Sequence, residues 1–258
     1  MPLINSSVTV THIATATAII SVDGINLLTD PAFCPAGSAY EYDGWAKAPN
    51  LEEWGFKETP PPSTLRSIHG PAQQLSEIPP IDAVLLSHED HNLLPRPGVV
   101  GLQPWQTVEA NIGGKHFRIT GTPCKHFPGG EVTGFVLETD SFGVDAETGL
   151  PNVVYFSGDT VWIDELAELG KRWHVVVAVL NLGNVLFPYP KGVLQITFDG
   201  KQAAHLMKVT RAEHMVPIHF ECWEHFTEHH AELREVFKQE GVEDKVRWLT
   251  PAVATQIV

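Results

Sequence analysis

The chain has 258 residues, 43% of them hydrophobic, which is enough for a substantial core in a single domain over residues 1–258. Its formal charge of −14, from 31 acidic and 17 basic residues, disfavours binding to nucleic acid and to anionic lipid surfaces. Residues 1–7 lack the basic and apolar regions of a secretory signal, and no apolar run reaches the roughly 18 residues of a membrane helix, so we expect a cytoplasmic protein without a membrane span.

The amino-terminal third begins with predicted β-structure. Residues 8–22 are rich in Val, Ile and Thr, and the pair Asp23-Gly24 predicts a tight turn into a second strand over residues 25–29. Residues 34–80 are rich in Pro, Gly and Trp and have little periodicity. They therefore predict a long irregular excursion over the surface, of the kind that often forms the wall of a pocket.

Four apolar runs along the rest of the chain end in polar residues. Residues 81–87 form a short continuous apolar run, which is typical of a strand buried on both faces, and His88 follows it directly. Residues 153–156 lead into Asp159 in the same way, residues 175–180 end at Asn181, and residues 215–218 end at His219. Polar residues that follow buried strands lie at the rim of a sheet, where sites are usually built.

The remaining elements are predicted from turn and cap signals. Strands are expected over residues 106–112, 116–120 and 134–138, with Gly113-Gly114 as a hairpin turn and His126 in the loop before the last strand. Helices are expected over residues 163–169, 200–210 and 227–239, with Asp199 as the N-cap of the second helix.

Metal-ligating residue types therefore occur at four separate strand ends: residues 88–91, His126, Asp159 and His219. A single histidine at such a place is most often a capped residue or one at the edge of the core. Several together suit a borderline divalent cation such as zinc, with open coordination positions for water and substrate. Three distant cysteines without a CxxC pair predict neither a disulfide framework nor a structural zinc knuckle.

The order of these motifs resembles the metallo-β-lactamase superfamily. An SH-containing strand end, TPCKHFPGGE, YFSGDT and MVPIHF follow one another in that family's order. Together with THIATAT and LLTDPAF near the amino terminus, they look like the branch that includes ascorbate-phosphate lactonase-like and N-acyl-phosphatidylethanolamine phospholipase-like proteins.

The resemblance implies an α/β fold, a four-layer αβ/βα sandwich with two facing mixed β-sheets and the site along one edge. It implies metal ligands at His88, His91, His126, Asp159 and His219, with Asp159 bridging two ions or binding the second, and one or two zinc ions, with manganese or iron as alternatives. It also implies catalysis by a metal-activated water on a small ester, lactone or phosphodiester. A small-molecule substrate is the expected partner, and a homo-oligomer is left open.

One departure from the family pattern concerns the first ligand motif. His91 is followed by Asn92-Leu93-Leu94-Pro95, without the downstream aspartate and the helix that the family normally has there. Either a segment has been lost between His91 and Asn92, or residues are missing from the sequence at this junction. If the loss is real, Asp90 is the residue that would replace one lost ligand, and we count it with His126 and Asp159 among the candidate catalytic residues.

Other residues have two interpretations each. Asp30 fits a turn or strand cap as well as a residue that orients a ligand, and Cys124 is interpreted as a buried small residue rather than a metal ligand. His225, His229 and His230 are interpreted as a solvated helix face, and the aromatic residues of the excursion as either a pocket wall or core. The alternative to a hydrolase is a non-catalytic or metal-impaired binding protein of the same fold, and a nuclease is disfavoured by the charge.

Overall fold

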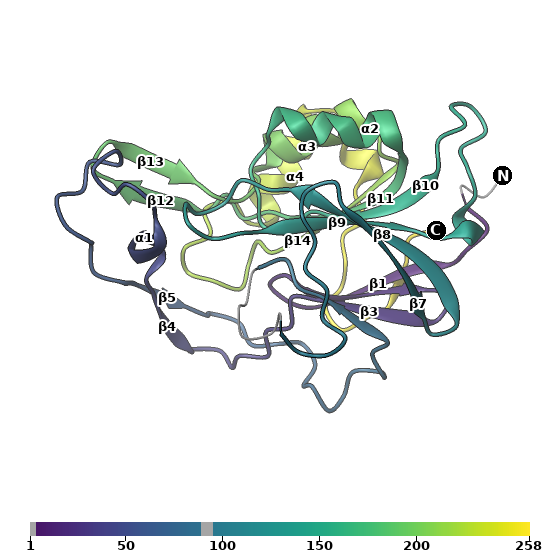
Figure 1. Ribbon diagram of the computed structural model, residues 1–258, viewed down its shortest axis with the longest axis horizontal. Coiled ribbons are helices and arrows are strands. Elements are labelled where there is room, and N and C mark those ends of the chain that lie inside the picture. Colours follow the sequence, from purple (N-terminus) through teal and green to yellow (C-terminus); the bar gives the residue numbers. More distant parts are fainter. Residues whose placement is uncertain (1–3, 89–94) are drawn as a thin grey trace.

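Two mixed β-sheets face each other across the main core of the protein (Figure 1). The computed structural model describes residues 4–88 and 95–258, so Asp90, His91 and the junction with Asn92 lie outside the described residues. The smaller sheet has the strand order β15 (Thr255–Gln256), β1 (Val8–Ala14), β2 (Thr17–Val22), β3 (Ile25–Thr29) and β6 (Ala83–Leu85). The larger sheet has the order β14 (His214–Ile218), β11 (His174–Asn181), β10 (Asn152–Phe156), β9 (Thr133–Glu138), β8 (Lys115–Pro123) and β7 (Thr107–Ile112).

The pairing within the sheets determines where the strands end. β10, β11 and β14 are parallel neighbours, so their carboxyl ends lie at the same edge of the larger sheet. β6 is parallel to β3 in the smaller sheet. The two sheets meet where β6 ends, because the backbone N–H of Thr133 donates to the Ser87 carbonyl at 2.8 Å and a bridge joins His88 to Val132.

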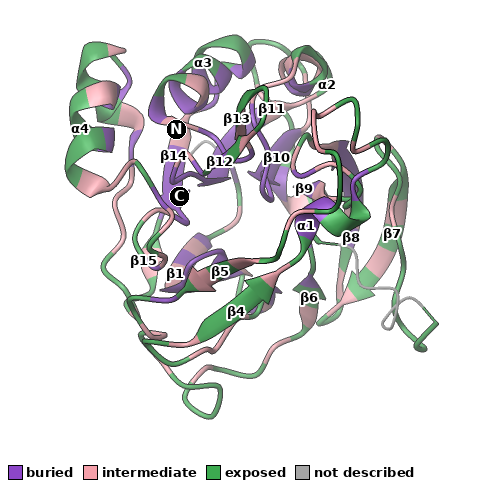
Figure 2. Cartoon of the chain, turned by 90° about the vertical axis from the view of Figure 1, so that its left-hand side faces the viewer, coloured by how far each residue is buried: buried purple, intermediate pink, exposed green. Residues whose placement is uncertain are grey.

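The apolar side chains fill the spaces that the strand pattern predicts. Inward-facing residues of both sheets, such as Val10, Leu27, Phe117 and Val154, form the core between the sheets. A second core lies under the helices that cover the outer face of the larger sheet: α2 (Leu169–Arg172), α3 (Gly200–Thr210) and α4 (His230–Gln239). Figure 2 shows these helices above the two sheets.

The two facing mixed sheets of the predicted four-layer sandwich are confirmed, and a helical layer covers the larger sheet. Among the described residues, no second helical layer covers the smaller sheet. Over the outer face of the smaller sheet, the described residues place irregular chain, and Phe33, Ile78 and Ile81 pack there against Ile13 and its neighbours. No helix among the described residues is long and apolar enough to cross a membrane.

The excursion over residues 34–80 is more ordered than its composition predicts. It contains β4 (Ala39–Tyr42), paired with β5 (Ser63–Arg66), and the single turn α1 (Gly44–Lys47). Together with the hairpin of β12 (Leu186–Tyr189) and β13 (Gly192–Gln195), it builds an aromatic cluster at one end of the molecule. We use this name for the residues Tyr42, Trp45, Trp54, Phe127, Phe187, Tyr189, Trp223 and Phe226.

One prediction about the strands is wrong. The strand of residues 81–87 was expected to be buried on both faces, but β6 is an edge strand, and Val84 and Leu86 are 49% and 37% exposed. The helical stretch expected near residues 163–169 is present as a 3-10 helix (Asp164–Glu168) that continues into the single turn of α2. Periodicity alone does not separate a central from an edge strand, or an α-helix from a tighter one.

Candidate metal centre

Three predicted ligands come together at the edge where the sheets meet. His88 follows β6 of the smaller sheet, whereas His126, in the loop between β8 and β9, and Asp159, after β10, belong to the larger sheet. One ligand atom from each of the three lies within 4.8 Å of the others. The Nε2 atom of His88 is 3.6 Å from Oδ2 of Asp159, and the rings of His88 and His126 are 5.2 Å apart at 89°.

His219, at the end of β14, approaches the same carboxylate. Its Nε2 atom lies 3.7 Å from Oδ2 of Asp159, but it does not belong to the compact group of three. Asp159 thus lies in a compact group with His88 and His126, and His88 and His219 both approach its Oδ2 atom. The structure brings four of the predicted site residues together, while His91 and Asp90 lie outside the described residues.

The ring orientation of these histidines is set by hydrogen bonds. Nδ1 of His126 lies 2.8 Å from the Ile196 carbonyl, and Nδ1 of His219 lies 3.2 Å from the Leu182 carbonyl. A carbonyl oxygen can only accept, so Nδ1 carries the proton in both rings and Nε2 keeps its lone pair for the cluster.

His88 is held through two further residues. Its Nδ1 atom lies 2.9 Å from the Ser87 hydroxyl, which in turn donates to Oδ2 of Asp30 at 2.7 Å. Oδ1 of Asp30 accepts from the Ser87 backbone N–H, also at 2.7 Å. Burial raises the pKa of Asp30, while His88 and the two Ser87 hydrogen bonds act in the opposite direction. With Asp30 ionised, the hydroxyl proton is used on Asp30, so the His88 ring donates from Nδ1 and its Nε2 keeps a lone pair. Of the two interpretations of Asp30, this contact supports the role in orienting a ligand.

The second oxygen of Asp159 is also positioned. Oδ1 accepts a hydrogen bond of 2.7 Å from the side-chain amide of Asn181, the last residue of β11. Burial by itself would raise the pKa of Asp159, but the imidazoles of His219, His88 and His126, together with the Asn181 amide, hold that pKa below its usual range. The carboxylate is therefore charged at neutral pH, as a metal ligand must be.

Burial keeps the His126 ring neutral, as a metal ligand must be. It lowers the pKa of His126 to about 4, and the neighbouring imidazole of His88 acts in the same direction. The ring is therefore neutral at pH 7 and has a lone pair to donate. A charged carboxylate beside imidazole nitrogens with free lone pairs fits a borderline divalent cation, because carboxylate oxygen and neutral imidazole nitrogen are the ligands that such cations bind.

The backbone at the site is strained at two ligand-bearing or ligand-orienting positions. Asp30 and His219 have φ angles of 33° and 63°, in the left-handed region that residues with a side chain rarely adopt. The His219 backbone N–H donates to the Thr15 carbonyl at 3.0 Å, which ties this turn to the smaller sheet. Conformations of this kind are found at functional sites, where the surrounding structure holds them.

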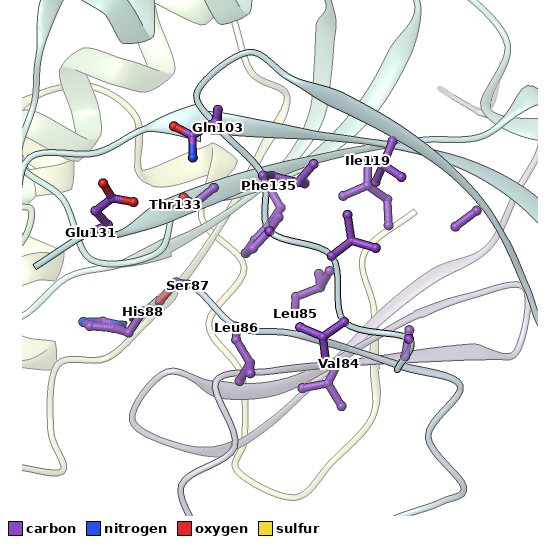
Figure 3. A pocket seen from close by; sticks show the side chains of 18 of the residues that line it. Val84, Leu85, Leu86, Ser87, His88, Gln103, Ile119, Glu131, Thr133 and Phe135 are labelled. Atoms are coloured by element: carbon purple, nitrogen blue, oxygen red, sulfur yellow. Dashed lines mark hydrogen bonds between the residues drawn. The ribbon is translucent and has the colours of Figure 1, made fainter. Parts of the chain in front are cut away.

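A cavity of about 620 Å³ opens beside His88 (Figure 3). We call His88, His126, Asp159 and His219 the metal-type cluster. Polar groups lie at the end of the cavity near this cluster, where Glu131, Gln103 and Thr133 accompany Ser87 and His88. The rest of its wall is apolar and comes from both sheets, including Val84, Leu85, Leu86, Ile119 and Phe135. His88, whose side chain is 50% exposed, gives this cavity contact with the cluster.

Cys124, predicted to be a buried small residue, is partly buried. Its thiol lies 3.4 Å from the Ser157 carbonyl, and burial raises the pKa of the thiol to about 12. A protonated thiol is a poor metal ligand. His229 and His225 differ from their prediction as a solvated helix face: His229 is the N-cap of α4, and His225 precedes that helix and contacts aromatic rings.

Sequence reasoning gave Ser87 no role, and it placed Asn181 at a strand end without a partner. Ser87 and Asn181 do stand at the ends of apolar strands, and that signal could have marked them. Their partners, Asp30 and Asp159, are far away in the sequence, so the contacts themselves could not be predicted.

Comparisons with known proteins agree with this architecture. No protein-family model matches the chain. A curated UPF0173 metal-dependent hydrolase of Solibacter usitatus (strain Ellin6076) is 29% identical over 130 residues, which cover 50% of this chain and 46% of that protein. The chain thus matches about half the length of this relative.

Solved structures extend the likeness over nearly the whole chain. The isothiocyanate hydrolase from Delia radicum gut bacteria superposes with a TM-score of 0.66 at 17% identity, over 96% of this chain and 98% of that one. The metallo-β-lactamase fold protein YhfI from Bacillus subtilis superposes with a TM-score of 0.53 at 15% identity, over 97% and 98%. At such identities the likeness establishes the fold.

Proposed function

This chain has the metallo-β-lactamase fold, and from that premise we propose that it is a metal-dependent hydrolase. The observation that carries the proposal is the state of three histidines around one carboxylate. His88, His126 and His219 each have Nδ1 occupied by a hydrogen bond, which leaves Nε2 for the space beside Asp159. The name of the Solibacter relative and that of the isothiocyanate hydrolase support a hydrolytic reaction.

The residues that would hold the metal are His88, His126 and Asp159, with His219 as a further ligand. Asp159 would bind one or two ions together with these histidines, because His88 Nε2 and His219 Nε2 lie 3.6 and 3.7 Å from its Oδ2 atom. His91 and Asp90 complete the proposed ligand set from outside the described residues. Imidazole and carboxylate favour zinc, and manganese or iron would use the same ligands.

The chemistry of the bound cation would be Lewis acidity, which acidifies a water molecule and polarises the scissile group. The protein's own residues prepare the site for it. Asp159 keeps its charge, Asn181 fixes the orientation of the carboxylate, and the Asp30–Ser87 pair holds the His88 ring. The exposed side of His88 lets a substrate reach the cluster from the cavity.

The proposed substrate is a small ester, lactone or phosphodiester. A cavity with a polar end at His88 and apolar walls suits a compact molecule whose reactive group lies at the metal and whose apolar part lies along the wall. The acidic charge of the chain argues against a nucleic-acid substrate. A location in the cytoplasm agrees with the sequence and is part of the proposal.

The test combines metal analysis with turnover. Purified protein loaded with zinc or manganese is expected to retain at least one ion per chain and to hydrolyse 4-nitrophenyl butyrate, δ-valerolactone or bis(4-nitrophenyl) phosphate. Chelation, Asp159→Ala and His126→Ala should each abolish turnover. Protein that binds no metal at any ratio would refute the proposal, and protein that binds metal but hydrolyses none of the probes would support the non-catalytic alternative.

A further inference from the structure

Glu131 is an acidic residue at the end of the cavity that lies beside the metal-type cluster (Figure 3). It comes just before β9, where an isolated bridge joins the next residue, Val132, to His88. The Thr133 backbone N–H donates to the Ser87 carbonyl at 2.8 Å, which holds the same segment against the end of β6. The place of Glu131 beside His88 therefore follows from the contact between the two sheets.

The alternation of side chains along this segment directs Glu131 towards the cavity. Residues 131, 133 and 135 line the cavity, whereas residues 132 and 134 do not. Side chains two positions apart point to the same face of an extended strand, so Glu131 shares the cavity face with Thr133 and Phe135.

Glu109, in β7, also borders the cavity but directs its carboxylate elsewhere. Val108 and Ala110, on either side of it, are half-buried, and the exposed positions of β7 alternate with these. The Glu109 side chain is 70% exposed, and its Oε2 atom lies 3.6 Å from Nε2 of His116 on the neighbouring strand. Glu131 is therefore the glutamate whose charge acts on the contents of the cavity.

The negative charge of Glu131 is not offset within the cavity wall. Among residues 4–88 and 95–258, no side chain forms a hydrogen bond or an ion pair with its carboxylate. Neither lysine nor arginine is among the described residues that line the cavity, and the sequence of residues 89–94 contains neither. The rest of the wall is apolar and screens a charge less than water does. A positively charged group is favoured near Glu131, and a negatively charged one is disfavoured.

A role as a metal ligand is not supported for Glu131. It does not belong to the compact group of His88, His126 and Asp159. A metal ion in that group would attract the reactive oxygen of a substrate. The charge of Glu131 therefore concerns the group next to the scissile bond, because both lie at the same end of the cavity.

We propose that Glu131 makes this site select substrates with a positively charged group, such as an ammonium, close to the scissile bond, and discriminate against a negative charge there. The inference rests on the proposed hydrolase function and narrows its substrate class. Neutral or cationic esters and lactones fit the site better than phosphodiesters, whose phosphate carries its negative charge at the same end. The apolar part of the substrate lies along the wall that includes Ile119 and Phe135.

The test uses three butyrate esters of similar size that differ in the charge of the alcohol: butyrylcholine, its neutral isostere 3,3-dimethylbutyl butyrate, and the anion 3-(butyryloxy)propanoate. Turnover by the zinc-loaded full-length protein is followed by titration of the released butyric acid. Glu131→Gln removes the charge and keeps the shape of the side chain. Glu109→Gln is the matched control, because it removes an equal charge whose partner is His116. Zinc content and calorimetric binding of hexyltrimethylammonium are measured for each variant.

We expect the wild type to have its highest kcat/KM for butyrylcholine and its lowest for the anion. Glu131→Gln should lower the ratio of these two values by about tenfold, since an exposed charge changes each of them by about threefold, in opposite directions. Binding of hexyltrimethylammonium should weaken by about threefold in the same variant. Glu109→Gln should keep the wild-type ratio, and 0.5 M salt should reduce that ratio in the wild type, as expected for a screened charge.

Three outcomes would overturn the inference while leaving the proposed function intact. They are an unchanged ratio in Glu131→Gln, an equal loss in Glu109→Gln, and loss of zinc from Glu131→Gln. If the zinc-loaded wild type hydrolyses none of the three esters, the proposed function fails. The binding of hexyltrimethylammonium then decides about the cavity: weaker binding to Glu131→Gln supports its selection of cations, and equal binding overturns it.

Discussion

The Ser87 hydroxyl is expected to have a large effect on metal affinity, because it holds the proposed ligand His88 in one tautomer. Ser87→Ala removes the contact with His88 Nδ1 and the hydroxyl hydrogen bond to Asp30 Oδ2, while the backbone N–H of residue 87 still donates to Asp30 Oδ1. Partners of this kind typically change metal affinity by about 10- to 100-fold. We therefore expect zinc affinity to fall in that range, as measured by competition with a chromophoric chelator.

The matched control for Ser87→Ala is Ser67→Ala. Ser67 is 3% exposed and Ser87 is 2% exposed, and each hydroxyl donates one hydrogen bond, but that of Ser67 goes to the His69 carbonyl, away from the cluster. Equal zinc affinities in the two variants would show that the Ser87 hydroxyl does not position His88.

The lowered pKa of His225 predicts how the free energy of unfolding of the metal-free protein depends on pH. Its folded pKa of about 4 lies below the ordinary value of 6.5, so below pH 6.5 the unfolded chain takes up a proton that the folded protein does not. Stability should fall as the pH is lowered from 6.5 towards 4. After a discount for the partial exposure of the ring, the contribution is about 2 kcal/mol.

Urea unfolding at pH 7.5 and pH 4.5 measures this contribution. His225→Phe should lose less stability between the two pH values than the wild type does, and His230→Phe should lose as much as the wild type. The same pH dependence in His225→Phe and the wild type would contradict a depressed pKa at this residue.

At the scale of elements, the ends of β6 and β10 approach each other closely at Gly158, where there is no room for a side chain. Gly158 has a φ of 58°, and a Cβ atom there would lie 2.9 Å from Ser87 Cβ and 3.0 Å from the Thr133 carbonyl oxygen. Gly158→Ala must push apart the two strand ends that bear His88 and Asp159. Overpacking of this kind costs about 1–3 kcal/mol, and zinc affinity should fall with it.

Gly241→Ala separates the clash from the positive φ angle. Gly241 has a similar φ of 70°, but a Cβ atom there would meet nothing within 4 Å. Urea unfolding should therefore show a larger loss for Gly158→Ala than for Gly241→Ala, and zinc affinity should change only in the former. Equal losses would mean that backbone strain alone, and not the contact with Ser87, makes glycine necessary.

The elements show which parts of the fold the sequence could predict. Continuous apolar runs such as residues 153–156 and 175–180 matched β10 and β11 to within a residue or two. A strand buried on both faces consists almost entirely of apolar residues, so it is easy to recognise in the sequence. The Gly113-Gly114 turn and the Asp199 cap were also predicted, and Asp199 Oδ1 accepts from the Gln202 backbone N–H at 2.7 Å. These signals are local.

The features that the sequence did not predict depend on contacts between segments that are distant in the sequence. The edge position of β6 is decided by which strands pair with it, and β4 and β5 pair with each other although α1 and a long irregular segment separate them in the sequence. At the site, motif order predicted which ligands converge, and the structure places His88, His126, Asp159 and His219 accordingly. Their role with metal stays a prediction, and the groups that orient them emerged only from the folded chain.

For the whole molecule, the position of the cluster predicts that metal stabilises the entire sandwich. His88 comes from the smaller sheet, whereas His126, Asp159 and His219 come from the larger one, so a bound ion would join the two sheets at their common edge. A ligand that binds only the folded state at 1,000 times its Kd stabilises by about 4 kcal/mol. Chelation of the zinc-loaded protein should therefore lower its Tm by several degrees, in one cooperative transition.

The Asp159→Ala variant tests whether this gain comes through the site. Without the carboxylate, the imidazoles have no charged partner, so the Tm of the variant should not respond to zinc or to chelation. The wild type should lose its added stability in calorimetry as zinc leaves, in proportion to the ions counted per chain. If chelation removes the zinc but the Tm of the wild type does not change, the ion does not link the two sheets, and the four side chains are not its ligands.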